Sequence, residues 1–134
     1  MLVVIAIMGL TAVLILSHGA PRSAGARETA TASEIVQSLR LARSRAIADG
    51  APSTVVIDTA THTLLLDGLA PKPLPPEIPL SLDPGDGHGR TLAQFRFAPD
   101  GSAQSGVIVL GLPPKRIRIA VQWLSGAVET RYVQ

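Results

Sequence analysis

The sequence contains no cysteine and few aromatic residues, and both absences narrow the classes of function. Without a thiol there is no cysteine nucleophile, no disulfide and no cysteine-based zinc site. Two Phe, one Trp and one Tyr in 134 residues are too few to build the stacking platforms that bind single-stranded nucleic acid or sugars. No serine occupies a Gly-x-Ser-x-Gly elbow, and no glycine-rich phosphate loop opens a helix. We therefore expect no enzyme activity, no catalytic residues and no cofactor.

The histidines and charged residues also do not indicate a site for a metal ion or for nucleic acid. His18, His62 and His88 lie far apart in the sequence and have no acidic or histidine partner at metal-ligand spacing, so no metal site is expected. Residues 50–134 carry seven Lys or Arg and seven Asp or Glu, which leaves this part formally neutral. Phosphate binding needs clustered cations, and a strand would place only Arg116 and Arg118 on one face. Nucleic acid is not expected as a partner.

What the sequence does have is a long apolar start. Only Gly9 and Thr11 interrupt the apolar side chains of residues 1–16. A helix of that length spans about 24 Å, a little less than the roughly 30 Å of a hydrocarbon core. We expect residues 1–20 to form a transmembrane or assembly helix and residues 21–134 to form one domain. The side chains expected to make its membrane and assembly contacts are Leu2, Val3, Val4, Ile5, Ile7, Met8, Leu10, Val13, Leu14, Ile15 and Leu16.

A second helix is predicted over residues 27–49, after a break between residues 17 and 26 that contains Pro21. Apolar residues recur there at spacings of three and four, and Gly50 and Pro52 supply the stop. One face of this helix should pack on a β-sheet. The expected helix–sheet core consists of Ile35, Val36, Leu39, Ala42, Ala46, Ile119, Val121 and Trp123.

From residue 53 to residue 134 the apolar period changes to two, which is typical of strands. Two short runs at 54–58 and 62–66 predict a hairpin. The proline-rich residues 68–90 predict a long loop with a brief edge strand near residues 78–82. Further strands are expected over 94–97, 107–110, 116–123 and 127–133, joined as an antiparallel meander. Alternation over 116–123 predicts that Trp123 is buried beside Ile119 and Val121. The fold class is therefore α+β, with a long N-terminal helix packed on an antiparallel β-sheet head.

Four segments resemble a known family. The opening residues 1–10 resemble the stretch of type IV pilins and pseudopilins that follows their Gly-Phe-Thr-Leu-(Ile/Leu)-Glu start. Residues 97–102, residues 123–128 and the helix end at 41–50 are similar to the H-type minor pseudopilins, the GspH/FimT family. The turn residues that carry this resemblance are Pro99, Asp100, Gly101, Ser102 and Gly126.

The resemblance implies a pilin-like fold and a structural role. A family member would be a methylated, single-pass inner-membrane protein with a periplasmic head, and it would stack helix to helix with other pseudopilins. It would belong to the tip of the type II secretion pseudopilus, which exports protein cargo across the outer membrane. The resemblance equally permits a minor type IV pilin that takes part in pilus assembly or DNA uptake.

Two further expectations concern the start of the chain. Ser17 to Ala20 weakly imitate a signal-peptidase site, so a secreted periplasmic binding domain with a cleaved signal peptide is a third possibility. The family's leader and its glutamate do not precede Met1, and no Lys or Arg stands before the apolar run. We therefore expect the reading frame to continue upstream of Met1.

Overall fold

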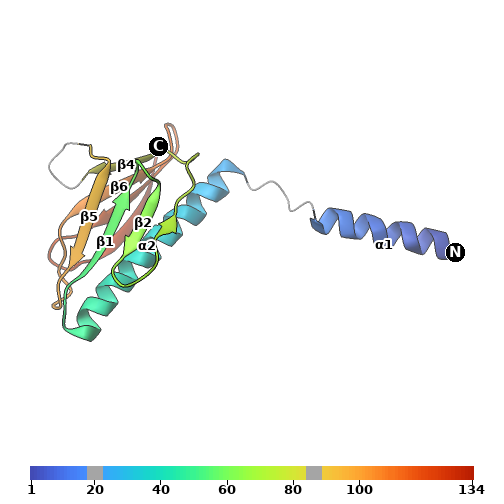
Figure 1. Ribbon diagram of the computed structural model, residues 1–134. Helices are drawn as coiled ribbons and strands as arrows, with labels where there is room; N and C mark the ends of the chain where they lie inside the picture. The colour runs from blue at the N-terminus through green and yellow to red at the C-terminus, as the bar shows by residue number, and fades with distance from the viewer. Residues whose placement is uncertain (18–22, 84–88) are drawn as a thin grey trace.

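The computed structural model describes residues 1–17, 23–83 and 89–134, with the side chains of the first helix described for residues 1–10. In these described ranges, two helices are followed by eight strands. Figure 1 shows how the elements are arranged. The helices are α1 (Leu2–Ser17) and α2 (Ala24–Asp49). The strands are β1 (Ser53–Asp58), β2 (Thr63–Leu66), β3 (Lys72–Pro73), β4 (Leu80–Asp83), β5 (Leu92–Phe97), β6 (Gly106–Leu110), β7 (Arg116–Val121) and β8 (Val128–Val133).

Helix α2 begins three residues before the predicted start because a capping residue precedes it. The hydroxyl of Ser23 accepts a hydrogen bond from the backbone N–H of Ala26 at 3.3 Å, which satisfies one of the free donors of the first turn. The helix ends at Gly50, which adopts a left-handed conformation with φ of 62°. Of the predicted break at residues 17–26, residues 18–22 lie outside the described residues, and residues 24–26 belong to α2.

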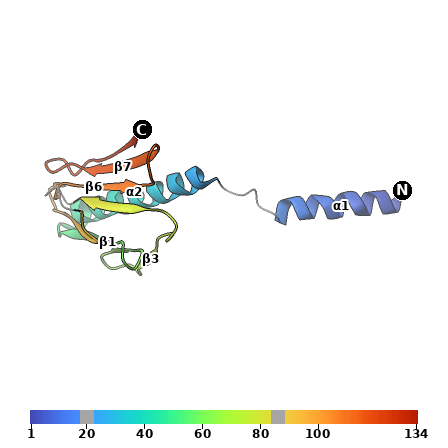
Figure 2. The ribbon, with the colours of Figure 1, turned by 90° about the horizontal axis from the view of Figure 1, so that it is seen from above.

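The described strands form two four-stranded antiparallel sheets, whereas the sequence predicts one meander. The first sheet has the order β3-β2-β1-β5, and the second has the order β4-β6-β7-β8. β1 pairs both with its hairpin partner β2 and with β5, so a strand that comes much later in the sequence completes the first sheet. Seen from above, β1 and β3 lie on one side of the head and β6 and β7 on the other (Figure 2).

Helix α2 contacts strands of both sheets and closes one common core. Its buried face contains Ala32, Ile35, Val36, Leu39, Ala42 and Ala46, and the strands add Ile119 and Val121 among others. The two sheets also meet directly, because the ring of Phe95 lies against Gly106. A Cβ atom at position 106 would stand 2.6 Å from Cε1 of Phe95, so any larger residue would force the buried ring to shift.

The expected burial of Trp123 is wrong. β7 ends at Val121, two residues earlier than predicted, and the chain then turns. The Gln122 N–H donates to the carbonyl oxygen of Ala127, and the Gly126 N–H donates to that of Gln122. Because the alternation of faces stops where the strand stops, Trp123 leaves the core side, and 64% of its surface is exposed.

Candidate functional site

Helix α1 carries an apolar surface on every side. Its described side chains from Leu2 to Leu10 are exposed, including Leu2, Val3, Val4, Ile5, Ile7, Met8 and Leu10. Val13, Leu14, Ile15 and Leu16 belong to the same helix, but their side chains lie outside the described part. A helix that is apolar all round is normally buried against lipid or protein. Within the described ranges, no helix combines the length and the apolar character needed to cross a membrane.

A second candidate site lies at the C-terminal end of α2, where Arg43 touches two turns of the head. Its Nε donates to the carbonyl oxygen of Gly101 at 3.3 Å. The same side chain lies against the backbone of Gly126, where an added Cβ would stand 3.1 Å from Nε. That Cβ would also overlap the carbonyl oxygen of Gly101. Arg43 and two glycines thus hold the 98–102 turn and the 122–126 turn together.

The 98–102 turn is rigidified by its own polar groups. Oδ1 of Asp100 accepts hydrogen bonds from the hydroxyl of Ser102 at 2.6 Å and from its backbone N–H at 2.9 Å. The Ser102 hydroxyl, followed by its N–H, lowers the pKa of Asp100 from the ordinary value of 3.8. Gly101 has φ of 87°, a conformation that glycine adopts without strain. Pro99 is exposed beside them. The turn residues expected from the sequence therefore form one compact unit.

The 122–126 turn presents two large apolar side chains to solvent. Trp123 and Leu124 are 64% and 76% exposed. Their backbone is nevertheless fixed, because the carbonyl oxygen of Trp123 accepts from the N–H of Ala103 at 2.9 Å. A fixed backbone that exposes an indole and a leucine suits contact with another protein, since the ordering cost is already met in the free head.

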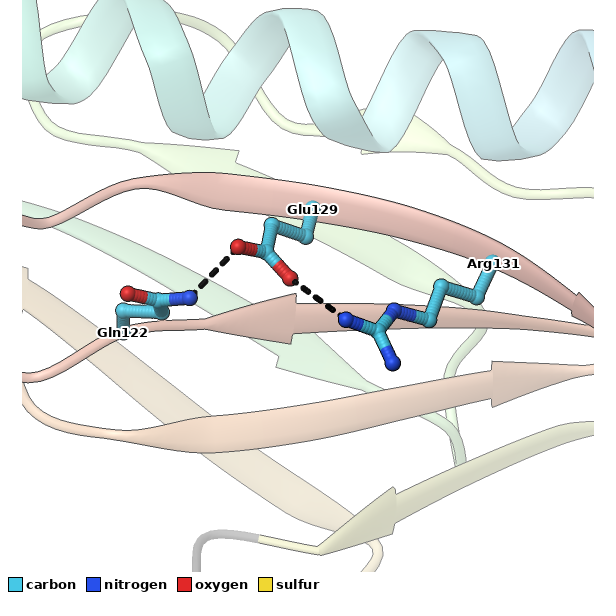
Figure 3. A network of polar contacts seen from close by, with 3 residues as sticks. All are labelled: Gln122, Glu129 and Arg131. Atoms are coloured by element: carbon cyan, nitrogen blue, oxygen red, sulfur yellow. Dashed lines mark hydrogen bonds and ion pairs between the residues drawn. The ribbon is translucent and has the colours of Figure 1, made fainter.

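The cations of the second sheet are partly engaged with neighbouring polar groups. Glu129 accepts from Nε2 of Gln122 and faces the guanidinium of Arg131 at 3.5 Å (Figure 3). Arg118 lies on the same exposed face, opposite Arg131 in the register of β7 and β8. This mixed surface keeps an exposed sheet face soluble.

In the described ranges, no group of three or more His, Asp or Glu side chains could hold a metal ion. His62 follows β1 in a turn with φ of 50°. His18 and His88 lie outside the described residues.

Arg43 is the residue of this site that sequence reasoning did not single out. The resemblance covered residues 41–50 but assigned Arg43 no role. A signal was present, because Arg43 follows Leu39 by one helical turn and adjoins Ala42, at the border of the apolar stripe. A half-buried guanidinium at such a border needs hydrogen-bond acceptors, and carbonyl oxygens of a neighbouring element can supply them.

Solved structures of the same fold are found among pilus-like proteins. The minor pseudopilin EpsH from the type II secretion system of Vibrio cholerae matches with a TM-score of 0.63 and 17% identity, over 78% of this chain and 96% of that one. The type IV minor pilin FimU of Pseudomonas aeruginosa matches with a TM-score of 0.60 and 13% identity, over 83% and 92% of the two chains. The expected pilin-like α+β fold is thereby confirmed.

The family follows from the sequence itself. The family model described as type II transport protein GspH matches residues 31–126, which include α2 from Thr31, the 98–102 turn and Gly126. The chain therefore belongs to the GspH family of pilin-like proteins, as its motifs predicted. No curated protein sequence matches significantly.

Proposed function

We propose that this chain is a minor pseudopilin, a structural subunit of a type II secretion pseudopilus. The observation that carries the proposal is the GspH family match over residues 31–126, which spans both motif turns. The structural likeness to EpsH supports the same assignment. Subunits of this family act as structural pieces of an assembly, and the head offers rigid surfaces that suit this work.

In the proposed function, α1 holds the subunit in the inner membrane and the head stands in the periplasm. Seven large apolar side chains between Leu2 and Leu10 are exposed. At about 1.5 kcal/mol or more for each, removing them from water is worth roughly 10 kcal/mol. Lipid supplies this burial before assembly. Helices of neighbouring pseudopilins supply it afterwards, so the subunit can leave the bilayer without exposing α1 to water.

The head would then transmit force during export of protein cargo. Arg43 joins the C-terminal end of α2 to the two turns, and the core joins α2 to both sheets. A load applied through α2 would therefore move the head as one body.

A second candidate is a minor pilin of a type IV pilus. The likeness to FimU favours it, because its TM-score and coverage are similar to those of EpsH. Both roles use the same anchor and the same head, and they differ in the partner subunits.

Deletion of the gene tests the two roles against each other. Under the main proposal, the deletion strain loses secretion of folded proteins to the medium and keeps its pili and twitching motility. Loss of pili with normal secretion would refute the proposal and favour the second candidate. Complementation with Ile5→Asp should fail, because a carboxylate on α1 opposes both lipid and helix contacts. The matched variant Leu69→Asp, at an exposed loop position of the head, should complement.

A further inference from the structure

The four outer strands of the two sheets differ in how their free edges are protected. β3 is two residues long and consists of Lys72 and Pro73. The edge of β4 is met by Arg90, whose N–H donates to the carbonyl oxygen of Leu82 at 3.1 Å. β8 carries the charged pair Glu129 and Arg131. Short length, covering and charge are the usual means by which proteins prevent edge pairing.

Between Arg90, which pairs with Leu82 of β4, and Arg96, which accepts from Gln104, no described residue covers the outer edge of β5. Thr91 to Phe95 are uncharged. The backbone N–H and C=O groups of successive strand residues point alternately toward β1 and toward the outer edge, so every second residue has its groups free. Thr91 offers its carbonyl oxygen to Thr59, on the β1 side, whereas Arg96 offers its carbonyl oxygen to the N–H of Gln104, on the outer side. Because residues of one strand alternate between the two sides, Leu92 and Gln94 point their N–H and C=O groups outward. No described residue pairs with these groups.

The same edge already binds an extended segment further along. Ala103 pairs with Phe97 in an antiparallel bridge, and Ser102 and Gln104 complete its hydrogen bonds. The chain then leaves β5 to enter β6. Beside the open stretch lies a groove of about 580 Å³, lined by Leu92, Gln94, Gln104, Ser105 and Trp123 among others, with Arg90 as the one charged residue of its described lining. Its apolar rim is exposed, since Leu92 is 53% and Trp123 is 64% accessible.

We propose that this groove binds an extended segment of a partner polypeptide by strand addition to β5. The segment continues the pairing that Ser102 to Gln104 begin, and its backbone bonds to the outward groups of Leu92 and Gln94. At about 3.3 Å per residue, roughly four residues of strand fill the open stretch. An apolar side chain of the segment packs on Trp123. Free backbone donors and acceptors at strand spacing select a polypeptide in extended conformation.

The test uses the full chain in detergent micelles and a fluorescein-labelled, acetylated hexapeptide in which Thr and Val alternate. Fluorescence anisotropy measures binding, and a peptide with Pro at every second position is the negative probe. Trp123 is the chain's only tryptophan, so a blue shift of its emission places the peptide in the groove. We expect saturable binding of the Thr-Val peptide with that shift, and no binding of the proline peptide.

The deciding variant is Gln94→Pro. It removes an N–H group that points away from β1, and it leaves the hydrogen bonds between β5 and β1 intact, so an edge strand tolerates it. We expect this variant to bind the peptide at least about tenfold more weakly than the wild type does. Its control is Thr130→Pro, which makes the same change on the outward side of β8 and should bind like the wild type. If Gln94→Pro lowers the urea midpoint, Gln94→Lys replaces it and should also weaken binding, since charge protects edges.

Three results would overturn the proposal: no binding by the wild type, equal binding by the Gln94 variants, or an equal loss in Thr130→Pro. None of them bears on the secretion phenotype, so the proposed function stands or falls separately.

Discussion

At the scale of single residues, the junction of Arg43 with Gly101 and Gly126 shows how a family motif acts. Neither glycine takes part in chemistry. Gly126 is required because the carbonyl oxygen of Gly101 occupies the place that a side chain would need. Gly101 is required because its φ of 87° belongs to the left-handed region. The motif therefore encodes a close approach of two turns.

Gly126→Ala should destabilise the head by more than about 2 kcal/mol, since strain in φ adds to a backbone clash. The matched control is Gly50→Ala. Gly50 has the same φ of 62°, but nothing lies within 4 Å of its added Cβ. That control should cost about 1 kcal/mol. Urea unfolding measures both, and equal costs would show that the two turns do not touch as described.

The Asp100 carboxylate gives the 98–102 turn a dependence on pH. Hydrogen bonds from Ser102 lower the pKa of Asp100 in the folded state. They therefore stabilise the folded turn fully at pH values above 3.8, the ordinary pKa of the group. That contribution is lost as the pH falls through the lowered pKa. An NMR titration should find the pKa of Asp100 below 3.8, and Ser102→Ala should raise it. A pKa unchanged by Ser102→Ala would contradict the hydrogen bond.

Trp123 marks a limit of sequence reasoning at this scale. Alternation over residues 116–121 correctly separates Ile119 and Val121 from Arg118, but it contains no information about where the strand ends. The turn at Gln122 is set by hydrogen bonds to Gly126 and Ala127.

Trp123→Ala should therefore change the free energy of unfolding by no more than about 0.5 kcal/mol, as is usual for an exposed side chain. The urea midpoint of the full chain measures it. A loss of about 3–5 kcal/mol, typical of a buried tryptophan, would return Trp123 to the core.

At the scale of elements, α2 illustrates what periodicity does predict. Its three- and four-residue spacing is a property of the helix itself, so the buried face could be read without knowing what covers it. Leu39 and Leu41 are two residues apart, yet Leu39 is fully buried and Leu41 is 43% exposed.

Leu39→Asp should unfold the head, because even Leu→Ala at such a site costs about 2–5 kcal/mol and a carboxylate adds the penalty of a buried charge. Leu41→Asp should leave the urea midpoint unchanged within about 0.5 kcal/mol. Circular dichroism in urea distinguishes the two. Comparable damage from both substitutions would mean that the helix is rotated from the position described.

Strand pairing could not be predicted in the same way. A period of two identifies a strand and its buried face, but it does not identify the neighbouring strand. β5 pairs with β1 across more than thirty residues, and this long-range choice divides the strands into two sheets. The proline-rich region was predicted as a long loop with a brief edge strand near residues 78–82. The structure has β4 at that place and adds the two-residue β3.

At the scale of the whole molecule, the apolar helix α1 and a head with a mixed polar surface belong to one chain. The described part of α1 exposes apolar side chains on all sides, whereas the head buries 22 apolar residues in one core and exposes others singly or in small groups. Composition and periodicity predict this division. Membership of the GspH family could be predicted only from short motifs, and the EpsH and FimU structures of the same fold are only 13–18% identical to this chain.

The most direct test of the account asks what α1 touches in the assembled state. A photo-crosslinking residue, p-benzoylphenylalanine, replaces Leu10 in cells that secrete actively, and Leu69 in the head serves as the control position. We expect Leu10 to form an adduct with another pseudopilin of the secretion system, and the adduct to disappear when the remaining pseudopilins are deleted. An adduct with type IV pilus subunits instead, or one that persists without the other pseudopilins, would contradict the account.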